Sequence, residues 1–191
     1  RANQRKHGLL ALPDGQLTAA RVLRDAGYAT GGFGKWGLGN PGTTGAAEKQ
    51  GFDVFFGYYD QKHAHDFYTD HLVRNGVAVP HPQSGRQTWE DYSHTRIVNE
   101  TLNFIEQNKD RPFFCYAAWT PPHGAHVIPD SAPYSQEPWS EAVRNYAAMV
   151  ALIDKDVGRV LQKLKDLSLD DNTLVIFTSD NGANEDFIKP L

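Results

Sequence analysis

The stretch that most directly predicts the fold is Thr173-Leu-Val-Ile-Phe-Thr-Ser-Asp-Asn-Gly182. Its first half is short and apolar, which is typical of a strand buried in a parallel sheet. It ends at Asp180 and Asn181, whose side-chain oxygen atoms suit a hard cation. Because ligands bind at the carboxyl ends of strands in open α/β sheets, the stretch also predicts a binding site. The alternative is that Asp-Asn-Gly is only a turn after a strand.

The bulk composition indicates one globular domain. The chain has 191 residues, of which 40% are hydrophobic and 22% are charged. Its net charge of -4 does not favour a nucleic-acid partner. No apolar run approaches the ~20 residues that a membrane span needs. We therefore expect neither a nucleic-acid partner nor a membrane span.

Helices and strands are expected to alternate along the chain. Periodicity and capping signals predict helices over residues 18–26, 92–108 and 141–167, and strands over residues 28–33, 112–119 and from 173. The second of these strands reads as a central strand. Turn signals at Asn75-Gly76 and Ser84-Gly85 predict a hairpin within residues 69–88. This order predicts an α/β fold with a mostly parallel sheet flanked by helices.

A glycine-rich stretch, Gly31-Gly-Phe-Gly-Lys-Trp-Gly-Leu-Gly39, follows the first predicted strand. So many glycines are unusual in a strand or helix and let the backbone approach a ligand closely. Lys35 lies within this stretch and can hold an anion as a point charge. It does not form a phosphate-binding P-loop, because Trp36 stands where Ser or Thr is required. The alternative is a flexible loop with a solvated lysine.

Two pairs of histidines are further candidates. His63 and His65 are two residues apart, so in an extended segment their imidazoles point the same way. They predict either the rim of an active site or a pair of surface histidines. His123 and His126 lie in a Pro/Gly-rich loop after the strand predicted at residues 112–119. Either pair can supply ligands or proton carriers, unless the loop histidines are incidental.

Candidate ligands therefore follow three predicted strands, at Lys35, His123 and Asp180. The chain around them resembles the arylsulfatase type of sulfatase, within the alkaline-phosphatase-like superfamily. The matching segments, which also agree in order and spacing, are Leu17-Thr-Ala-Ala-Arg-Val-Leu-Arg-Asp-Ala-Gly-Tyr-Ala-Thr30, Gly34-Lys-Trp-Gly-Leu-Gly39, Gly51-Phe-Asp-Val-Phe-Phe-Gly57, Pro121-Pro-His123 and Ser179-Asp-Asn-Gly182. The resemblance covers almost the whole chain.

This resemblance implies an enzyme that hydrolyses sulfate esters. Such enzymes use a formylglycine, made from the first residue of a Cys/Ser-x-Pro/Ala-x-Arg motif, and a calcium ion that holds the sulfate. By motif, Asp180 and Asn181 correspond to calcium ligands, and Lys35 corresponds to a contact with the sulfate or the leaving-group oxygen. His123 corresponds to the histidine that contacts the sulfate or leaving group, with His126 as the second choice.

Two departures from the family pattern matter. The family usually has histidine where this chain has Gly37, and His63 or His65 is the candidate to fill that role. The family also places its Cys/Ser-x-Pro/Ala-x-Arg motif upstream of Arg1, and residues 1–16, ahead of the first matching segment, contain no such motif. The resemblance thus implies that residues 1–191 are a partial sulfatase catalytic domain, incomplete at both ends and lacking the nucleophile segment and the C-terminal subdomain.

The predicted function is that of a sulfuric ester hydrolase as the parent protein, with little or no activity in residues 1–191 alone. The substrate is expected to be a sulfated carbohydrate or an aryl sulfate, with Trp36 among the aromatic side chains that can stack on a sugar. The resemblance also suggests a periplasmic or secreted location. The alternatives are a phosphatase or phosphodiesterase of the same superfamily, or a non-catalytic sulfatase-like fragment.

Overall fold

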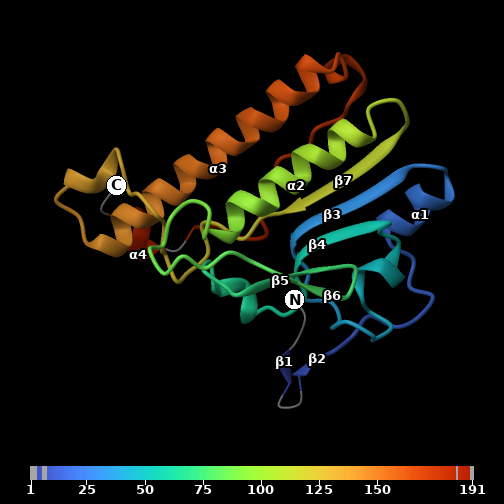
Figure 1. Ribbon diagram of the computed structural model, residues 1–191, viewed down its shortest axis with the longest axis horizontal. Coiled ribbons are helices and arrows are strands. Elements are labelled where there is room, and N and C mark those ends of the chain that lie inside the picture. Colours follow the sequence, from blue (N-terminus) through green and yellow to red (C-terminus); the bar gives the residue numbers. More distant parts are fainter. Residues whose placement is uncertain (1–3, 6–7, 184, 190–191) are drawn as a thin grey trace. The chain divides into compact units, whose positions relative to one another are not determined.

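The computed structural model describes residues 4–5, 8–183 and 185–189. The chain divides into two compact units, residues 1–120 and residues 121–191, and each unit is described by itself (Figure 1). The first unit begins with a short antiparallel pair, β1 (Gln4–Arg5) and β2 (Gly8–Leu9). Its main feature is a five-stranded sheet.

The sheet joins parallel and antiparallel strands. Its strands are β3 (Ala29–Lys35), β4 (Val54–Tyr58), β5 (His71–Arg74), β6 (Val77–Pro80) and β7 (Phe113–Ala118), in the order β6-β5-β4-β3-β7. β3 is parallel to both β4 and β7, whereas β5 and β6 continue the sheet in antiparallel pairs. The predicted α/β class is confirmed. The sheet is mixed, however, and β7 is an edge strand of the sheet as described, not the central strand that was predicted.

The hairpin of β5 and β6 accounts for the mixed character of the sheet. Asn75 and Gly76 connect the two strands with φ angles of 45° and 81°, the pair of positive values that a tight two-residue hairpin needs. Asn75 also accepts a hydrogen bond at Oδ1 from the Phe55 backbone N–H, at 2.6 Å. The Asn75-Gly76 turn signal is therefore confirmed, and the chain reverses here instead of crossing over to another parallel strand.

The strand predicted over residues 28–33 extends further into the glycine-rich stretch than expected, to Lys35. Gly31, Gly32 and Gly34 all lie in β3. A Cβ atom at Gly32 would come within 2.9 Å of the Phe55 ring, and one at Gly34 would lie 2.1 Å from the backbone oxygen of Ala118. These glycines thus allow aromatic rings and the backbone of β7 to approach β3 closely.

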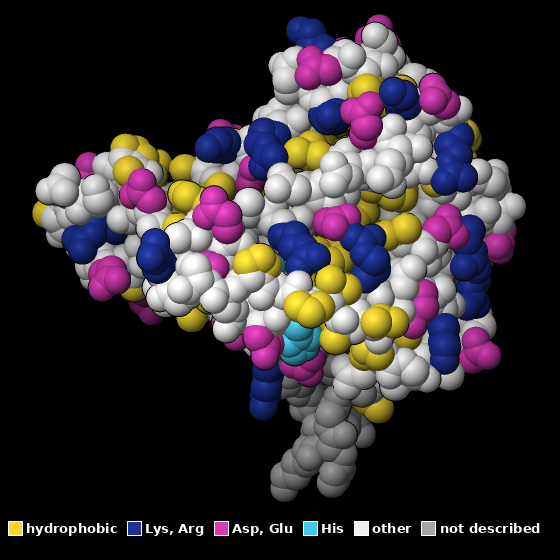
Figure 2. Space-filling model, viewed as in Figure 1, with side chains coloured by type: hydrophobic (Ala, Val, Ile, Leu, Met, Phe, Trp, Pro, Cys, Tyr) yellow, Lys and Arg dark blue, Asp and Glu magenta, His cyan; other side chains and the backbone are white. Residues whose placement is uncertain are grey.

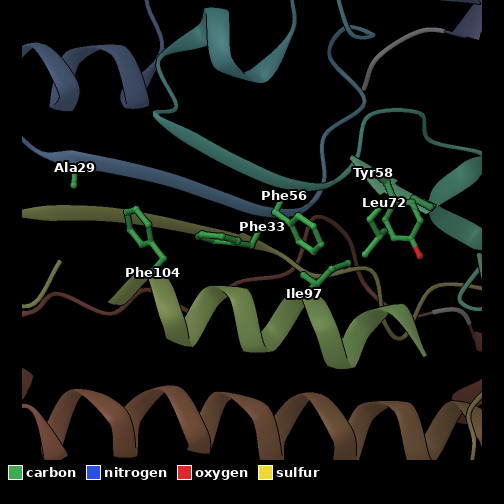
Figure 3. Close-up of a cluster of buried hydrophobic side chains, with 8 residues drawn as sticks. Ala29, Phe33, Phe56, Tyr58, Leu72, Ile97 and Phe104 are labelled. Atoms are coloured by element: carbon green, nitrogen blue, oxygen red, sulfur yellow. The ribbon is translucent and has the colours of Figure 1, made fainter. Parts of the chain in front are cut away.

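Each face of the sheet carries its own apolar cluster. On one face, α2 (Ser93–Gln107) packs through Ile97 and Phe104 against Phe33 of β3 and Phe56 of β4 (Figure 3). The rings of Phe33 and Phe104 lie 5.4 Å apart between centroids. The opposite face is covered by α1 (Ala19–Asp25) and η1 (Ala47–Gln50), with Phe52, Phe55 and Tyr59 in the second cluster.

The helices of the first unit begin and end near the predicted residues. Thr18 is the N-cap of α1, and its hydroxyl accepts a hydrogen bond from the Arg21 backbone N–H at 3.1 Å. Gly27 follows the helix with a φ of 90°. Both ends agree with the capping signals that predict a helix over residues 18–26.

The second unit contains one long helix and several short ones. α3 (Glu141–Asp166) is capped by Ser140 and matches the helix predicted over residues 141–167. The short helices are η3 (Tyr134–Gln136), η4 (Asp170–Asn172) and α4 (Glu185–Ile188). No helix among the described residues is long and apolar enough to cross a membrane.

The strand predicted from residue 173 does not form in this structure. Residues 173–179 have no strand pairing, and Leu174, Ile176 and Phe177 are exposed by 86%, 76% and 72%. A strand is stable only when its backbone groups pair with a neighbour. The second unit offers none, because residues 121–183 and 185–189 contain no other strand.

Charged side chains of both signs are interspersed on the face of the protein drawn in Figure 2. Figure 2 shows Lys and Arg interspersed with Asp and Glu on the face in view, with apolar side chains between them. This distribution agrees with the small net charge of the chain.

Candidate functional site

In the first unit, the candidate site lies at the carboxyl ends of β3 and β4. Lys35 is the last residue of β3 and is paired in register with Tyr58, the last residue of β4. Side chains two residues apart on a strand share a face, so Lys35 lies on the same face as Phe33, the face covered by α2. A half-buried lysine is thereby held at the sheet edge where α/β proteins bind ligands.

The chain turns tightly after β4. The Asp60 carboxylate accepts hydrogen bonds from the backbone N–H groups of Lys62 and His63, at 2.7 and 3.0 Å. These bonds hold η2 (His63–His65) as a single 3₁₀ turn. His63 and His65 are therefore not in an extended segment, and the expectation that both imidazoles point the same way is wrong.

Several contacts hold the His63 ring at this turn. It packs edge-on against the Tyr58 ring, with 4.9 Å between centroids, and lies 4.5 Å from the His71 ring. Its Nε2 atom is 2.6 Å from the hydroxyl oxygen of Thr69. The Tyr58 hydroxyl in turn lies 2.8 Å from the backbone oxygen of Asp66. The end of β4 thus fixes both sides of the turn that carries His63.

His71 belongs to the same cluster. Its Nδ1 atom lies 2.5 Å from the carboxylate of Asp70, and its backbone oxygen accepts a hydrogen bond from the Thr69 hydroxyl at 3.0 Å. We call His63, Thr69, Asp70 and His71 the histidine cluster. It joins the turn after β4 to the start of β5.

Burial and neighbouring charge set the proton affinity of this cluster. Burial, followed by the nearby His71, lowers the pKa of His63 below its usual value, and the carboxylates of Asp66, Asp60 and Asp70 act in the opposite direction. The hydrogen bond from His71 lowers the pKa of Asp70. The net effect favours the neutral form of His63.

Gly37 lies against the same turn. Its φ is 72°, and a Cβ atom there would come within 2.6 Å of Cγ of Gln61. The Gly37 backbone N–H donates to the Tyr59 oxygen at 3.1 Å. Gln61 thus occupies the space where a side chain at position 37 would begin.

Trp36 and His65 have different surroundings. The Trp36 indole packs against Phe52 and Phe55 at 5.7 and 6.0 Å between centroids, and its Nε1–H donates to the Gly45 oxygen at 2.8 Å. It belongs to the apolar cluster on the α1 face. His65 is half-buried at the end of η2. A substrate-binding role for either residue stays a prediction.

The second unit holds the other predicted histidines. His123 is exposed, and its Nδ1 lies 3.0 Å from the Gly124 oxygen. The His126 ring lies 4.2 Å from the Phe187 ring and 5.7 Å from the Tyr146 ring. Burial, followed by the charge of His123, lowers the pKa of His126. The two histidines therefore differ in exposure, although they are three residues apart.

Asp180 and Asn181, the predicted calcium ligands, are exposed in the second unit. The Asn181 side chain donates to the Gly182 oxygen at 3.0 Å. Among the described residues, no group of three or more His, Cys, Asp or Glu side chains lies close enough together to hold a metal ion. Calcium takes six to eight oxygen ligands, so these two side chains do not make a calcium site by themselves.

A model of the sulfatase family matches residues 5–186. The chain belongs to the sulfatase family. It is 33% identical over 187 residues to the human N-acetylgalactosamine-6-sulfatase, with 90% of this chain and 34% of the relative covered. It is 29% identical over 196 residues to the uncharacterized sulfatase YdeN of Escherichia coli, and the match covers 89% of this chain and 33% of that protein. The chain thus spans about a third of the length of these curated relatives.

A solved structure supports the fold of this sulfatase chain. It comes from work on the metabolism of multiple glycosaminoglycans by Bacteroides thetaiotaomicron, with a TM-score of 0.72 and 24% identity. The match covers 92% of this chain and 47% of that one. The α/β fold predicted from the sequence is therefore that of known sulfatase structures.

The sequence did not point to four residues that shape this part of the sulfatase chain: Gln61, Thr69, Asp70 and His71. The adjacent aspartate and histidine, Asp70-His71, could have indicated the contact between their side chains from the sequence alone. The contact of Gln61 with Gly37 had no signal in the sequence, since it depends on the path of the chain after β4.

Proposed function

We propose that the protein to which this chain belongs is a sulfuric ester hydrolase. The observation that carries the proposal is the match of the sulfatase family to residues 5–186, nearly the whole chain. The position of Lys35 agrees with it: a lysine in a Gly-Lys-Trp segment at the carboxyl end of a parallel strand. A lysine there stabilises negative charge that develops on the sulfate oxygens during cleavage.

The proposed substrate is a sulfated carbohydrate. The human relative carries the name N-acetylgalactosamine-6-sulfatase, and the Bacteroides structure comes from work on glycosaminoglycans. Both names point to sulfated sugars, although the match to the second protein supports only the fold. An aryl sulfate is the simpler substrate that a sulfatase of this family is also expected to cleave.

The residues of the second unit have proposed roles in the same reaction. His123 is exposed and can protonate the departing alkoxide or phenoxide oxygen. His126 is the second choice for this role. Asp180 and Asn181 can supply only part of a calcium shell, so a calcium site here requires further oxygen ligands. The precursor of the formylglycine is expected upstream of the matching segments, and residues 1–16 contain no such motif.

The test is sulfate release by the full-length protein. We expect turnover of a 6-sulfated N-acetylgalactosamine and of 4-nitrophenyl sulfate, and none by residues 1–191 alone. Lys35→Ala should lower kcat/KM by about 10²-fold or more, since removal of one preorganised charge contact costs about 3–4 kcal/mol in the transition state. Lys62→Ala is the matched control, because Lys62 is exposed in the turn after β4.

The outcomes separate three classes of protein. Hydrolysis of 4-nitrophenyl phosphate without sulfate release would indicate a phosphatase or phosphodiesterase. Hydrolysis of neither ester would indicate a non-catalytic sulfatase-like protein. Sulfate release that is unchanged in Lys35→Ala would leave the function in place but remove Lys35 from the site.

A further inference from the structure

The loop of residues 81–91, between β6 and α2, is fastened at both ends to the sheet edge that carries Lys35. At its start, the backbone N–H of residue 81 donates to the oxygen of Asp70, just before β5, at 2.8 Å. Two residues after its end, the Ser93 hydroxyl lies 2.5 Å from that of Tyr58, the residue in register with Lys35. The loop therefore lies at the carboxyl ends of β3 and β4.

One buried aromatic ring holds two partly exposed rings at this loop. Trp89 is exposed by 39%, and it packs edge-on against the buried Tyr92 ring with 5.9 Å between centroids. The half-buried Tyr68 ring lies 5.5 Å from the same ring. An exposed tryptophan that is held in place offers a large, rigid apolar surface to a ligand.

A hollow of about 400 Å³ lies between this loop and α2. Its walls combine two proline rings with side chains that form hydrogen bonds: Pro80, Pro82, Glu90, Thr95, Arg96 and Asn99. Arg96 is fixed in place, since its guanidinium donates to the Pro80 oxygen at 2.7 Å and lies 5.2 Å from the centroid of the Phe56 ring. Apolar faces and polar groups are thus side by side in a hollow of the size that binds small molecules.

This combination suits a sugar ring. A pyranose has an apolar C–H face that packs on an aromatic ring, and hydroxyl groups at its rim that both donate and accept hydrogen bonds. The Glu90 carboxylate can accept from such hydroxyls, and the Arg96 guanidinium can donate to them. A wholly apolar ligand would desolvate both charges without replacing their hydrogen bonds.

The sugar in this hollow is not the one whose sulfate lies at Lys35. Pro80 ends β6, which is three strands from β3 in the sheet. Neighbouring strands lie about 4.8 Å apart, so the two positions are separated by roughly 14 Å. That distance exceeds the span of one sugar ring, so a ligand that reaches both positions has several sugar rings.

We propose that Trp89 and the adjacent hollow form a subsite for a further sugar ring of an oligosaccharide substrate, beyond the ring that bears the sulfate. This inference rests on the proposed sulfatase function. No bond is made or broken at the subsite, and its contacts are the same before and during cleavage, so it acts by lowering KM. The protein then acts on sulfated chains in preference to single sulfated sugars.

The first experiment compares two substrates of the full-length protein. One is 4-nitrophenyl sulfate, and the other is a pentasaccharide whose central 6-sulfated N-acetylgalactosamine has two uncharged hexoses on each side. Trp89→Ala should lower the ratio of kcat/KM, pentasaccharide over aryl sulfate, by about 10-fold through a higher KM, since truncation of a tryptophan contact costs this much. Trp89→Phe keeps a ring and should lower the ratio less. Tyr28→Ala is the control, because Tyr28 is exposed by 37% and precedes β3 at the opposite edge of the sheet.

Two further measurements test the polar wall and the binding itself. Glu90→Ala should lower the same ratio about fivefold, as expected for loss of one hydrogen bond. Its control is Asp110→Ala, at an exposed aspartate that precedes β7 at the opposite edge of the sheet. Titration with the desulfated pentasaccharide, followed by tryptophan fluorescence, measures binding without turnover. The change in emission of the wild type should be lost in Trp89→Phe.

The outcomes separate the subsite from the function on which it rests. A wild-type protein that releases sulfate from neither substrate overturns both. A wild-type protein that cleaves 4-nitrophenyl sulfate, with an unchanged ratio in Trp89→Ala, overturns the subsite alone. A fall in kcat without a rise in KM also overturns it, because the subsite acts in binding. If Trp89→Ala does not fold, the fluorescence of Trp89→Phe decides, and an emission change equal to that of the wild type overturns the subsite.

Discussion

Asp91 shows how one carboxylate can organise a loop of this protein. It accepts hydrogen bonds from the backbone N–H groups of Ser84 and Thr88, at 2.7 and 3.2 Å, and from both of their hydroxyl groups. Its backbone oxygen lies 2.9 Å from Nε2 of buried His81. The hydrogen bonds from Ser84, followed by those from Thr88, lower the pKa of Asp91 from 3.8 to about 2.

We predict that Asp91→Asn lowers thermal stability at pH 7 and flattens its dependence on acid pH. Because the folded-state pKa lies below the unfolded value, the stabilisation is fully present above about pH 4 and is lost as the pH falls towards 2. The measurement is Tm from pH 7 to pH 3. Asp110→Asn, at an exposed aspartate, is the control. Parallel Tm curves for wild type and Asp91→Asn would contradict the prediction.

Residue-scale prediction from sequence succeeded where the signal was local and failed where it depended on a distant neighbour. The ends of the helix predicted over residues 18–26 agree with α1 and its caps, because a cap is defined by a few consecutive residues. The strand predicted over residues 28–33 stopped short of Gly34, whose place in β3 depends on the close approach of the Ala118 backbone in β7. For the same reason the partnership of His63 with His71 could not be read from the sequence.

At the scale of elements, the β5–β6 hairpin is fixed to β4 through one side chain. Asn75 accepts the Phe55 N–H at 2.6 Å, and its amide donates to the Asp53 oxygen at 3.0 Å. It also adopts a φ of 45°, which asparagine and glycine tolerate better than other residues. The turn and its anchor to the sheet therefore depend on the same residue.

We predict that Asn75→Ala destabilises the protein by about 2–4 kcal/mol, from an unsatisfied backbone N–H and a strained turn. Asn75→Gly removes the same two hydrogen bonds but relieves the strain, so it should cost about 1–2 kcal/mol less than Asn75→Ala. Urea unfolding followed by tryptophan fluorescence measures both. Equal losses in the two variants would show that backbone strain contributes nothing.

The helices and the hairpin could be predicted at this scale, whereas the order of strands in the sheet could not. Helix periodicity and the Asn75-Gly76 turn are properties of short segments. The edge position of β7, and the pairing of β4 on the other side of β3, depend on contacts between distant segments. The 173–179 segment has the composition of a strand, but composition does not supply the partner that a strand requires.

At the scale of the whole molecule, the apolar run of the second unit stands out. Leu174, Ile176 and Phe177 are mostly exposed, and Val175 between them is exposed by 45%. A short β-prone run with little charge is a site of self-association when it is accessible. β7 is the edge strand of the described sheet, and an edge strand presents one row of backbone groups without a strand partner.

We therefore predict that residues 1–191, expressed alone, self-associate at micromolar concentration. Replacing Ile176 and Phe177 by lysine should increase the monomer fraction, because charge blocks strand stacking. Size-exclusion chromatography with light scattering measures it. A second variant with lysine at exposed Asp170 and Asp171 tests whether added positive charge alone has this effect. Equal monomer fractions in the two variants would contradict a role for the apolar run.

The position of β3 between β4 and β7 also has a consequence in time. On the ribosome, β4 follows β3 after a short interval, but β7 is made roughly 80 residues later, which takes about 4–16 s at typical rates of synthesis. During that interval one side of the strand that bears Lys35 has no neighbour. The length of this delay is set by chain order alone, so no substitution within β3 can shorten it.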